Sequence, residues 1–261
     1  MAIKIAFVNN KGGVLKTTLT LNYAAVLAKK GYKVLIIDTD SQSNIASGFG
    51  IKKQVRNYTL HDLVFYFKNP LEAPIKVYEN IDIVLPGDSW RFFEEEISKR
   101  SIYGDEWRNL KEIIAEYENQ YDYILFDTEP KKGANVLSIL LVSDDLIIPF
   151  TLDAFGIEGL SKMHYFIKQA QNKNKKLKIK ALVATKTIKR NITEAAIKSQ
   201  ADKFFAPGLC PISIPSSVHD ARAITFNKLP IYLTNLNKQQ SQVYEKLVDL
   251  LEFNKKEKNN E

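Results

Sequence analysis

Short apolar runs alternate along the chain with segments whose apolar residues recur at helical spacing. Most of the apolar runs are continuous, which is typical of strands buried on both faces of a sheet. Strands are expected at Ile3–Val8, Val34–Ile37, Ile81–Leu85, Tyr123–Phe126, Leu146–Pro149, Ile179–Thr185 and Cys210–Ile214. Helices are expected at Thr17–Lys30, Trp107–Tyr117, Val136–Val142, Glu158–Gln171, Thr193–Phe204 and Gln239–Glu252.

The alternation of strand and helix predicts an α/β fold, with a mostly parallel twisted sheet flanked by helices on both faces. The chain shows no internal repeat and no Pro/Gly/Ser-rich linker, so residues 1–253 are expected to form a single domain. The polar tail 254–261 is expected to fray. Residues 50–80 and 88–106 are the least patterned parts of the chain and indicate no element.

A glycine-containing segment, Lys11-Gly12-Gly13-Val14-Leu15-Lys16-Thr17-Thr18, lies between the first strand and the first helix. Small residues let backbone N–H groups surround phosphate oxygens, and the N-terminus of the following helix favours an anion. A lysine then reaches the phosphates and a Ser/Thr hydroxyl binds Mg²⁺. Lys16 and Thr17 stand at those two positions, so this segment predicts a phosphate-binding loop.

Two further strands end in carboxylates. The run after Val34 ends in Asp38-Thr39-Asp40, and the run after Tyr123 ends in Asp127-Thr128-Glu129. Open α/β sheets bind ligands at the carboxyl ends of their strands, so these side chains are expected beside the phosphate loop. A carboxylate at such a strand end typically holds the Mg²⁺ shell in phosphoryl-transfer sites.

Together these segments resemble the ParA/MinD superfamily of ATPases. The loop resembles its deviant Walker A motif, KGGxGK[ST], and residues 34–44 resemble its switch segment, hhhhDxDPQxN. Residues 145–160, and Ile214-Pro215 with the residues up to Ile231, resemble segments of ParA proteins, the second around the loop that contacts adenine. The similarity spans about residues 3–232 and is closer to Soj-like ParA proteins than to MinD.

The resemblance implies a P-loop NTPase fold and a Mg²⁺-dependent ATPase that binds ATP on residues 11–18 and at Pro215. It implies that Lys16 acts within its own subunit and that Lys11 reaches the phosphates of a partner subunit. It further implies that Asp40 orients the attacking water. Thr17, Asp127 and Asp38 would form the metal site, with Asp38 also supporting the switch. ATP would favour a homodimer and slow hydrolysis would release it.

Besides Ser41, which replaces the proline of the switch segment, two residues depart from the family pattern. Leu15 stands where the family has glycine, and Glu129 replaces a proline of the usual DxPP. A bulky residue in place of glycine restricts the backbone and crowds the phosphates. One alternative is therefore a nucleotide-binding regulatory relative with weak or lost hydrolysis.

The net charge of +7 is unevenly distributed. Residues 1–150 hold 18 basic and 20 acidic residues, a net charge of −2, whereas residues 151–261 hold 19 basic and 10 acidic residues, a net charge of +9. Five lysines fall within residues 173–180. Basic residues that neutralise phosphates give salt-sensitive binding without sequence preference. The resemblance implies such DNA binding through Lys189, Arg190 and Arg222, and a ParB-type centromere-binding partner that stimulates hydrolysis.

Several classes of protein are disfavoured by composition. The single Cys210 excludes an intramolecular disulfide and a cysteine-rich metal cluster, and three scattered histidines disfavour a structural zinc site. No segment approaches the roughly 20 apolar residues of a membrane span. We therefore expect a cytoplasmic, nucleoid-associated protein that is not inserted in a membrane. A MinD-like or cargo-positioning ATPase is the other alternative, and the absence of a basic amphipathic C-terminal helix disfavours its membrane-bound form.

Overall fold

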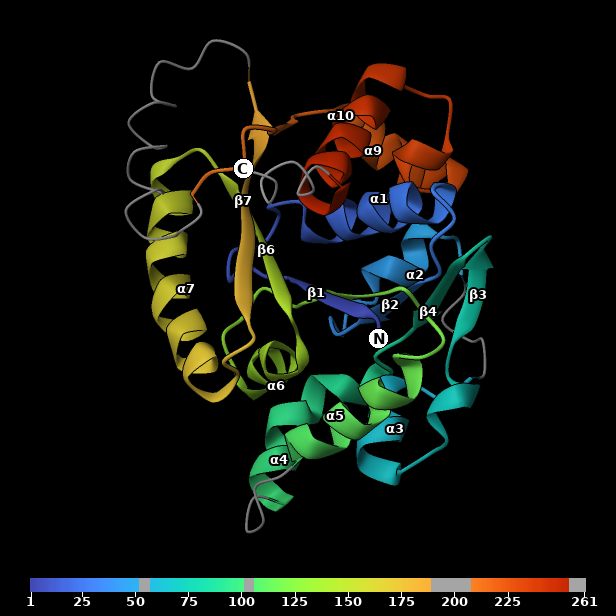
Figure 1. Ribbon diagram of the computed structural model, residues 1–261, viewed down its shortest axis with the longest axis vertical. Helices are drawn as coiled ribbons and strands as arrows, with labels where there is room; N and C mark the ends of the chain where they lie inside the picture. The colour runs from blue at the N-terminus through green and yellow to red at the C-terminus, as the bar shows by residue number, and fades with distance from the viewer. Residues whose placement is uncertain (52–56, 101–105, 189–207, 254–261) are drawn as a thin grey trace, which may run out of the picture.

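In the part of the chain that the structure describes, eight strands form one sheet in the order β3-β4-β2-β5-β1-β6-β7-β8 (Figure 1). The computed structural model describes residues 1–51, 57–100, 106–188 and 208–253. Adjacent strands run parallel throughout this sheet except for the antiparallel pair β3–β4. The strands are β1 Ile3–Phe7, β2 Val34–Asp38, β3 Ile75–Tyr78, β4 Ile81–Val84, β5 Tyr123–Asp127, β6 Asp145–Thr151, β7 Lys178–Thr187 and β8 Ile214–Pro215.

The connections that the structure describes in full contain helices, except that the two-residue turn Glu79-Asn80 joins β3 to β4. The α-helices are α1 Lys16–Lys29, α2 Asn44–Gly48, α3 Leu60–Tyr66, α4 Phe93–Arg100, α5 Glu106–Tyr117, α6 Ala134–Val142, α7 Ala154–Lys173, α9 Val218–Arg222 and α10 Lys238–Val248. Short 3-10 turns are η1 Pro70–Glu72, η2 Asp88–Phe92 and η4 Ile231–Leu233, and π-helical turns are η3 Ala223–Asn227 and η5 Asp249–Phe253. Within the described ranges, no helix has the length and apolar content that crossing a bilayer requires.

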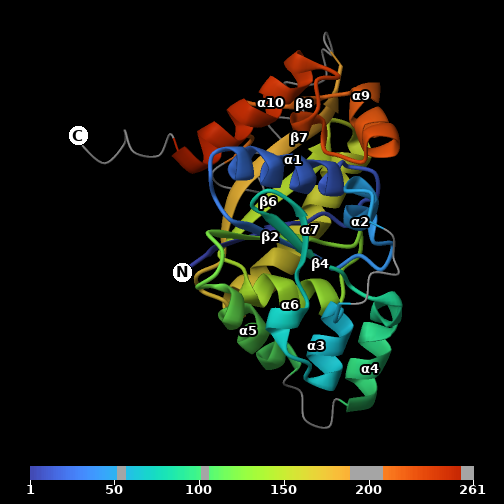
Figure 2. The same cartoon turned by 90° about the vertical axis from the view of Figure 1, so that its right-hand side faces the viewer.

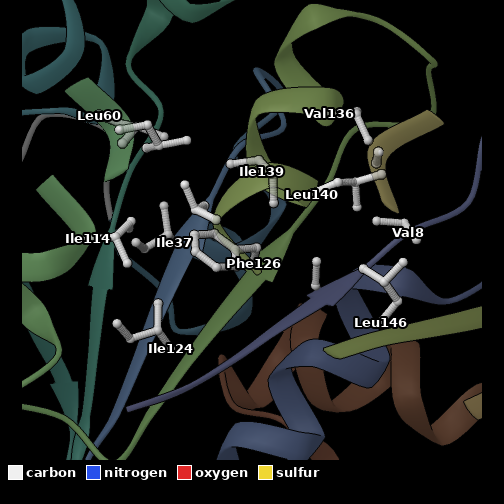
Figure 3. Close-up of a cluster of buried hydrophobic side chains, with 14 of the residues drawn as sticks. Val8, Ile37, Leu60, Ile114, Ile124, Phe126, Val136, Ile139, Leu140 and Leu146 are labelled. Carbon is white, nitrogen blue, oxygen red and sulfur yellow. The ribbon is translucent and has the colours of Figure 1, made fainter. Parts of the chain in front are cut away.

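The sheet separates two apolar clusters, because successive side chains of a strand point to opposite faces. In β1, Ile5 and Phe7 pack with α1 and α10, whereas Ala6 packs with α6 and α7 on the other face. Figure 2 shows α1 and α10 on one side of the sheet and α3, α5 and α6 on the other. The second face is filled largely by aliphatic side chains around Phe126 (Figure 3). The expected α/β fold with helices on both faces is thus confirmed.

Most expected strands and helices are found, with shifted ends. The strand expected at Cys210–Ile214 is wrong. Leu209 forms an isolated bridge to Leu182, and continuous pairing begins only at Ile214. Pro211 lies between these points and has no N–H for a ladder hydrogen bond. The short elements β3, α3 and α4 fall in the segments without clear periodicity, and α2 begins at Asn44, where no helix was expected. The expected helix Thr193–Phe204 lies outside the described residues.

The C-terminal turn η5 is tied to the amino-terminal ends of β5, β6 and β7 by an ion cluster. The Lys180 Nζ lies 2.9 Å from Asp145 Oδ2 and 2.7 Å from Glu252 Oε1, and the Lys180 and Glu252 side chains are 4% and 3% exposed. The hydroxyls of Tyr23 and Tyr123 both donate to the Glu252 carboxylate. Lys180, one of the five lysines in residues 173–180, therefore points into the molecule and is not part of a basic surface.

Candidate functional site

The two predicted carboxylate segments meet at one edge of the sheet. Asp38 and Asp127 are direct register partners at the carboxyl ends of β2 and β5, and Phe7 of β1 lies beside Asp127 on its other side. Both aspartates occupy positions that face α1, since the residues two positions before them pack in the cluster on that face. The phosphate loop follows β1, so the three predicted segments converge here.

The loop ends in a helix terminus that is open to an anion. Helix α1 begins at Lys16, and its N-cap residue, Leu15, makes no side-chain capping hydrogen bond. The first backbone N–H groups of a helix have no partner within the helix, and together with the helix dipole they favour a phosphate. Gly12 and Gly13 are exposed, and Gly13 has a φ of 71°, which glycine adopts without strain.

Contacts from neighbouring strands hold the loop in place. The Asn9 side chain donates to Pro149 O (2.7 Å) and accepts from the Lys11 N–H (2.9 Å). The Thr185 hydroxyl lies 3.2 Å from Val14 O. Asn9 and Thr185 were not identified from the sequence, because their role depends on β6 pairing with β1 and on β7 pairing with β6. They fix the backbone on which phosphates would rest.

Lys16 is buried at the base of the loop. Its Nζ donates to Lys11 O at 3.2 Å. Burial lowers the pKa of Lys16, and the nearby carboxylates of Asp127 and Asp40 oppose that shift. A cation held in a desolvated position beside a helix N-terminus is well placed to balance the negative charge of phosphates.

Asp38 and Asp127 are buried, and burial destabilises their ionised forms. Asp127 is fully buried, and burial raises its pKa to about 7 although Thr17 Oγ1 donates to Asp127 Oδ2 at 2.7 Å. Burial, followed by repulsion from Asp127, raises the pKa of Asp38 as well. The Thr20 hydroxyl, which no sequence motif indicated, lies 3.3 Å from Asp127 Oδ1. The Thr17 hydroxyl on Asp127, with the Asp38 carboxyl group paired beside it in register, fits Mg²⁺, which prefers oxygen ligands and would relieve the repulsion.

These shifts predict an unusual pH dependence of stability for the nucleotide-free protein. The pKa of Asp127 is about 7 in the folded chain, against 3.8 for an ordinary aspartate, so the folded state binds more protons between these values. The free energy of unfolding attributable to Asp127 is therefore highest below about pH 4 and falls as pH rises through 7. At pH 8 we expect Asp127→Asn to be more stable than wild type by about 1–3 kcal/mol, because the full shift is shared with the coupled Asp38.

Urea denaturation between pH 4 and pH 8, without metal or nucleotide, measures this difference. The stability gap between Asp127→Asn and wild type should open as pH rises. A gap that is constant over this range, or one that closes toward pH 8, would show that Asp127 is ionised throughout.

Asp40 follows the carboxyl end of β2 and is held by hydrogen bonds to neighbouring residues of the same turn. Its N–H donates to Asp38 Oδ1 at 2.9 Å, and its Oδ1 accepts from the Gln42 N–H at 3.0 Å. The second oxygen of Asp38 lies 3.3 Å from the N–H of Ile45 at the start of α2. Asp38 therefore braces the turn that carries Asp40, as well as facing Asp127.

Lys11 is directed away from its own loop. Its Nζ donates to the Thr151 hydroxyl at 3.0 Å and to the two oxygens of Asp153 at 3.1 and 3.2 Å. Asp153 also caps α7 by accepting from the Gly156 N–H. Thr151 ends β6 and Asp153 is the N-cap of α7. Both lie within residues 145–160, which resemble a ParA segment but were given no site role from the sequence.

Leu15 adopts the left-handed conformation in which the family places glycine. Its φ and ψ are 63° and 27°, and its partly buried side chain packs against the cluster under α1 and α10. A left-handed conformation costs a residue other than glycine roughly 1–2 kcal/mol. The expected departure from the family pattern is thus offset in part by side-chain packing.

Two substitutions at Leu15 separate backbone strain from packing. Leu15→Ala and Leu15→Gly both remove the side-chain packing, but only glycine also removes the left-handed strain. We expect the glycine variant to be the more stable of the two by about 1 kcal/mol in chemical denaturation. If alanine is the more stable, Leu15 does not hold this conformation in solution.

The remaining predicted site residues are separated from this cluster. Pro215 lies in β8 at the same edge of the sheet, paired with Thr187 of β7. Arg222 is exposed on α9. Lys189 and Arg190, the other two predicted DNA-binding residues, lie outside the described residues.

Comparison with known proteins agrees with this geometry. The AAA_31 family, described as an AAA domain, matches residues 2–179. A "ParA family protein" of Mycoplasma pneumoniae is 31% identical over 268 residues, which cover 95% of this chain and 96% of that protein. The "Chromosome-partitioning ATPase Soj" of Treponema pallidum is 30% identical over 256 residues, covering 95% of this chain and 96% of that protein.

The fold is also found among solved structures. A putative plasmid partition protein from Borrelia burgdorferi, crystallised with AMPPNP, superposes with a TM-score of 0.80 at 26% identity and covers 96% of this chain and 98% of its own. The phosphate loop, the paired strand-end aspartates and these relatives lead to one conclusion: the chain belongs to the ParA family, within the ParA/MinD superfamily of P-loop ATPases and close to the Soj-like partitioning proteins.

Proposed function

We propose that this protein is an ATP-driven DNA-partitioning ATPase that acts with Mg²⁺. The observation that carries the proposal is the convergence of Lys16, Thr17 and Asp127 at an open helix terminus. The lysine is buried beside the loop, and the hydroxyl contacts a strand-end carboxylate at 2.7 Å. The names of the relatives, which refer to chromosome and plasmid partition, support the same cellular role.

In this proposal the phosphates bind to the backbone of residues 11–18 and to Lys16, and Pro215 lines the adenine side. Thr17 would hold Mg²⁺ directly and Asp127 through water, with Asp38 supporting both the metal shell and the switch. The metal would supply charge neutralisation at the phosphates. Asp40 orients the attacking water from a turn that its neighbours hold in place.

Lys11 is proposed to act in a second subunit. In the isolated chain its amine is held by Thr151 and Asp153, and the Asp153 side chain is 46% exposed. An exposed ion pair contributes only about 0–1 kcal/mol, so the phosphates of a partner subunit can displace it. ATP would thereby favour the dimer, and hydrolysis would release it.

The proposed output is DNA binding without sequence preference, which places the protein in the cytoplasm at the nucleoid. The excess positive charge of residues 151–261 and the exposed Arg222 support this part of the proposal. Specificity would come from a ParB-type centromere-binding partner that stimulates hydrolysis.

Charge reversal of Arg190 and Arg222 together tests the DNA-binding proposal. We expect the double variant to lose most of its retention on nonspecific duplex DNA in the presence of ATP and Mg²⁺. The salt dependence should also be shallower, since two phosphate contacts are lost. ATP affinity, measured separately with a fluorescent nucleotide, should be unchanged. Equal DNA retention by the variant and wild type would contradict the assignment.

The same nucleotide titration tests the central claim. Wild type should bind ATP more tightly with Mg²⁺ than without it, and its ATPase rate should rise with DNA and the partner protein. ATP binding without any hydrolysis would instead favour the regulatory alternative, and no detectable ATP binding would refute the switch model.

A further inference from the structure

The peptide unit between Thr39 and Asp40 is hydrogen-bonded at both of its polar ends. The Thr39 carbonyl accepts from the Trp90 indole N–H at 2.9 Å and from the Asn135 side-chain amide at 3.2 Å. The Asp40 N–H of the same unit donates to Asp38 Oδ1. A peptide unit is planar, so fixing its carbonyl and its N–H fixes the plane from which Asp40 projects.

The donors to this carbonyl come from two different elements. Trp90, in η2, is 2% exposed, and its ring packs 4.5 Å from the ring of Phe93. Asn135, in the first turn of α6, is 1% exposed. Thr39 itself is fixed at its other end, because its N–H and its hydroxyl both lie 2.9 Å from Asp127 O. The segment between the two site aspartates is therefore held from three sides.

Glu129 sets the orientation of Asn135. Its Oε1 accepts from the Asn135 amide nitrogen at 2.9 Å, so that nitrogen donates to both Glu129 and Thr39. Turning the amide over would place its oxygen against two acceptors, which fixes the assignment of the donor. Glu129 Oε2 also pairs with Lys131 at 3.2 Å, but the lysine side chain is 67% exposed.

We infer that Trp90, Asn135 and Glu129 are positioning residues that hold Asp40 in the geometry required for hydrolysis. This inference rests on the proposed function for its kinetic consequence, but the clamp itself is a property of the nucleotide-free chain. It assigns a role to Glu129, the residue that departs from the family's DxPP pattern. In this chain the glutamate provides a side-chain acceptor, which a proline lacks.

Hydrogen exchange tests the clamp without any nucleotide. Trp90→Phe keeps an aromatic ring in the core but removes the N–H donor to Thr39 together with part of the ring volume. We expect the amides of residues 39–43 to exchange roughly tenfold faster in this variant, because the switch turn opens more often. Phe93→Leu is the matched control, since it disturbs the same ring packing and keeps the hydrogen bond.

Variants of Glu129 separate the hydrogen bond from the ion pair. Glu129→Gln retains a side-chain oxygen acceptor and should behave as wild type, and so should Lys131→Ala, which removes only the exposed ion pair. Glu129→Leu removes the acceptor and should speed exchange of the same segment. The kinetic counterpart is a fall in kcat of roughly tenfold for Trp90→Phe and Glu129→Leu, with KM for ATP unchanged.

The outcomes distinguish the clamp from the proposed function. If Phe93→Leu speeds exchange of residues 39–43 as much as Trp90→Phe does, packing alone holds the switch and the inference is overturned. It is also overturned if kcat is unaffected while wild type hydrolyses ATP. If wild type hydrolyses no ATP, the proposed function fails, and the exchange rates of the nucleotide-free variants still decide whether the clamp exists.

Discussion

Replacing Lys180 by methionine is expected to lower the free energy of unfolding by about 3–5 kcal/mol, because it leaves the buried carboxylate of Glu252 and the partly buried carboxylate of Asp145 without their cation. Asp145 and Glu252 both contact this amine within 2.9 Å, and Glu252 is nearly inaccessible to solvent. Methionine retains most of the apolar stem of lysine, so the loss reports the charge and not a cavity. Urea denaturation at neutral pH measures it.

A second substitution shows where the cost arises. Adding Glu252→Gln to Lys180→Met removes one of the two uncompensated charges and keeps a group that can accept from Tyr23. We expect the double variant to recover part of the lost stability. If Lys180→Met is as stable as wild type, the C-terminal turn η5 is not anchored to the sheet, and the proposed domain limit at residue 253 has to be moved toward the N-terminus.

Replacing Lys16 by alanine is expected to weaken ATP binding by about 100-fold or more, since hydrogen bonds to charged groups contribute roughly 1.5–3 kcal/mol each and the site is desolvated. The lysine is buried beside Asp127 and Asp40, whose charges it offsets in the nucleotide-free chain. Equilibrium titration with a fluorescent ATP analogue and Mg²⁺ measures the change in affinity.

Lys11→Ala is the matched control for this prediction. Lys11 lies in the same loop, but its amine is bound to Thr151 at the end of β6 and to Asp153 at the N-cap of α7. We expect its removal to leave the ATP affinity of the monomer within a few-fold of wild type and to abolish ATP-dependent dimerisation, followed by sedimentation. Equal losses of affinity in the two variants would contradict the division into one lysine acting in its own subunit and one acting in the partner.

Much of the fold follows from local patterns in the sequence. Buried parallel strands such as β2 and β5 are continuous apolar runs, and the start of α1 is marked by the glycines before it. The missed elements β3, α2, α3 and α4 are short. Tertiary contacts determine which of their side chains are buried, so their apolar residues show no clear helical or strand periodicity. The strand expected at Cys210–Ile214 is the opposite error, because an apolar run was taken for a strand. Pro211 within it has no N–H to donate to a neighbouring strand.

The site was predictable where one segment of chain carries the chemistry. Lys16, Thr17, Asp38 and Asp127 stand in motifs, and the structure brings them together. Trp90, Asn135 and Thr185 belong to no motif, because each contributes through a fold contact with a distant segment. The left-handed backbone conformation of Leu15 could not be inferred from leucine itself. The glycine that the family has at this position was the only sequence signal for it.

The in-register pairing of Asp38 with Asp127 restricts insertions and deletions within β2. Because side chains alternate along a strand, deleting one residue from β2 would turn every following side chain to the opposite face. Asp38 would then point away from α1 and into the apolar layer around Phe126. Length changes should therefore be rare among relatives between residues 34 and 40, and insertions should accumulate in the loops at the other end of the sheet.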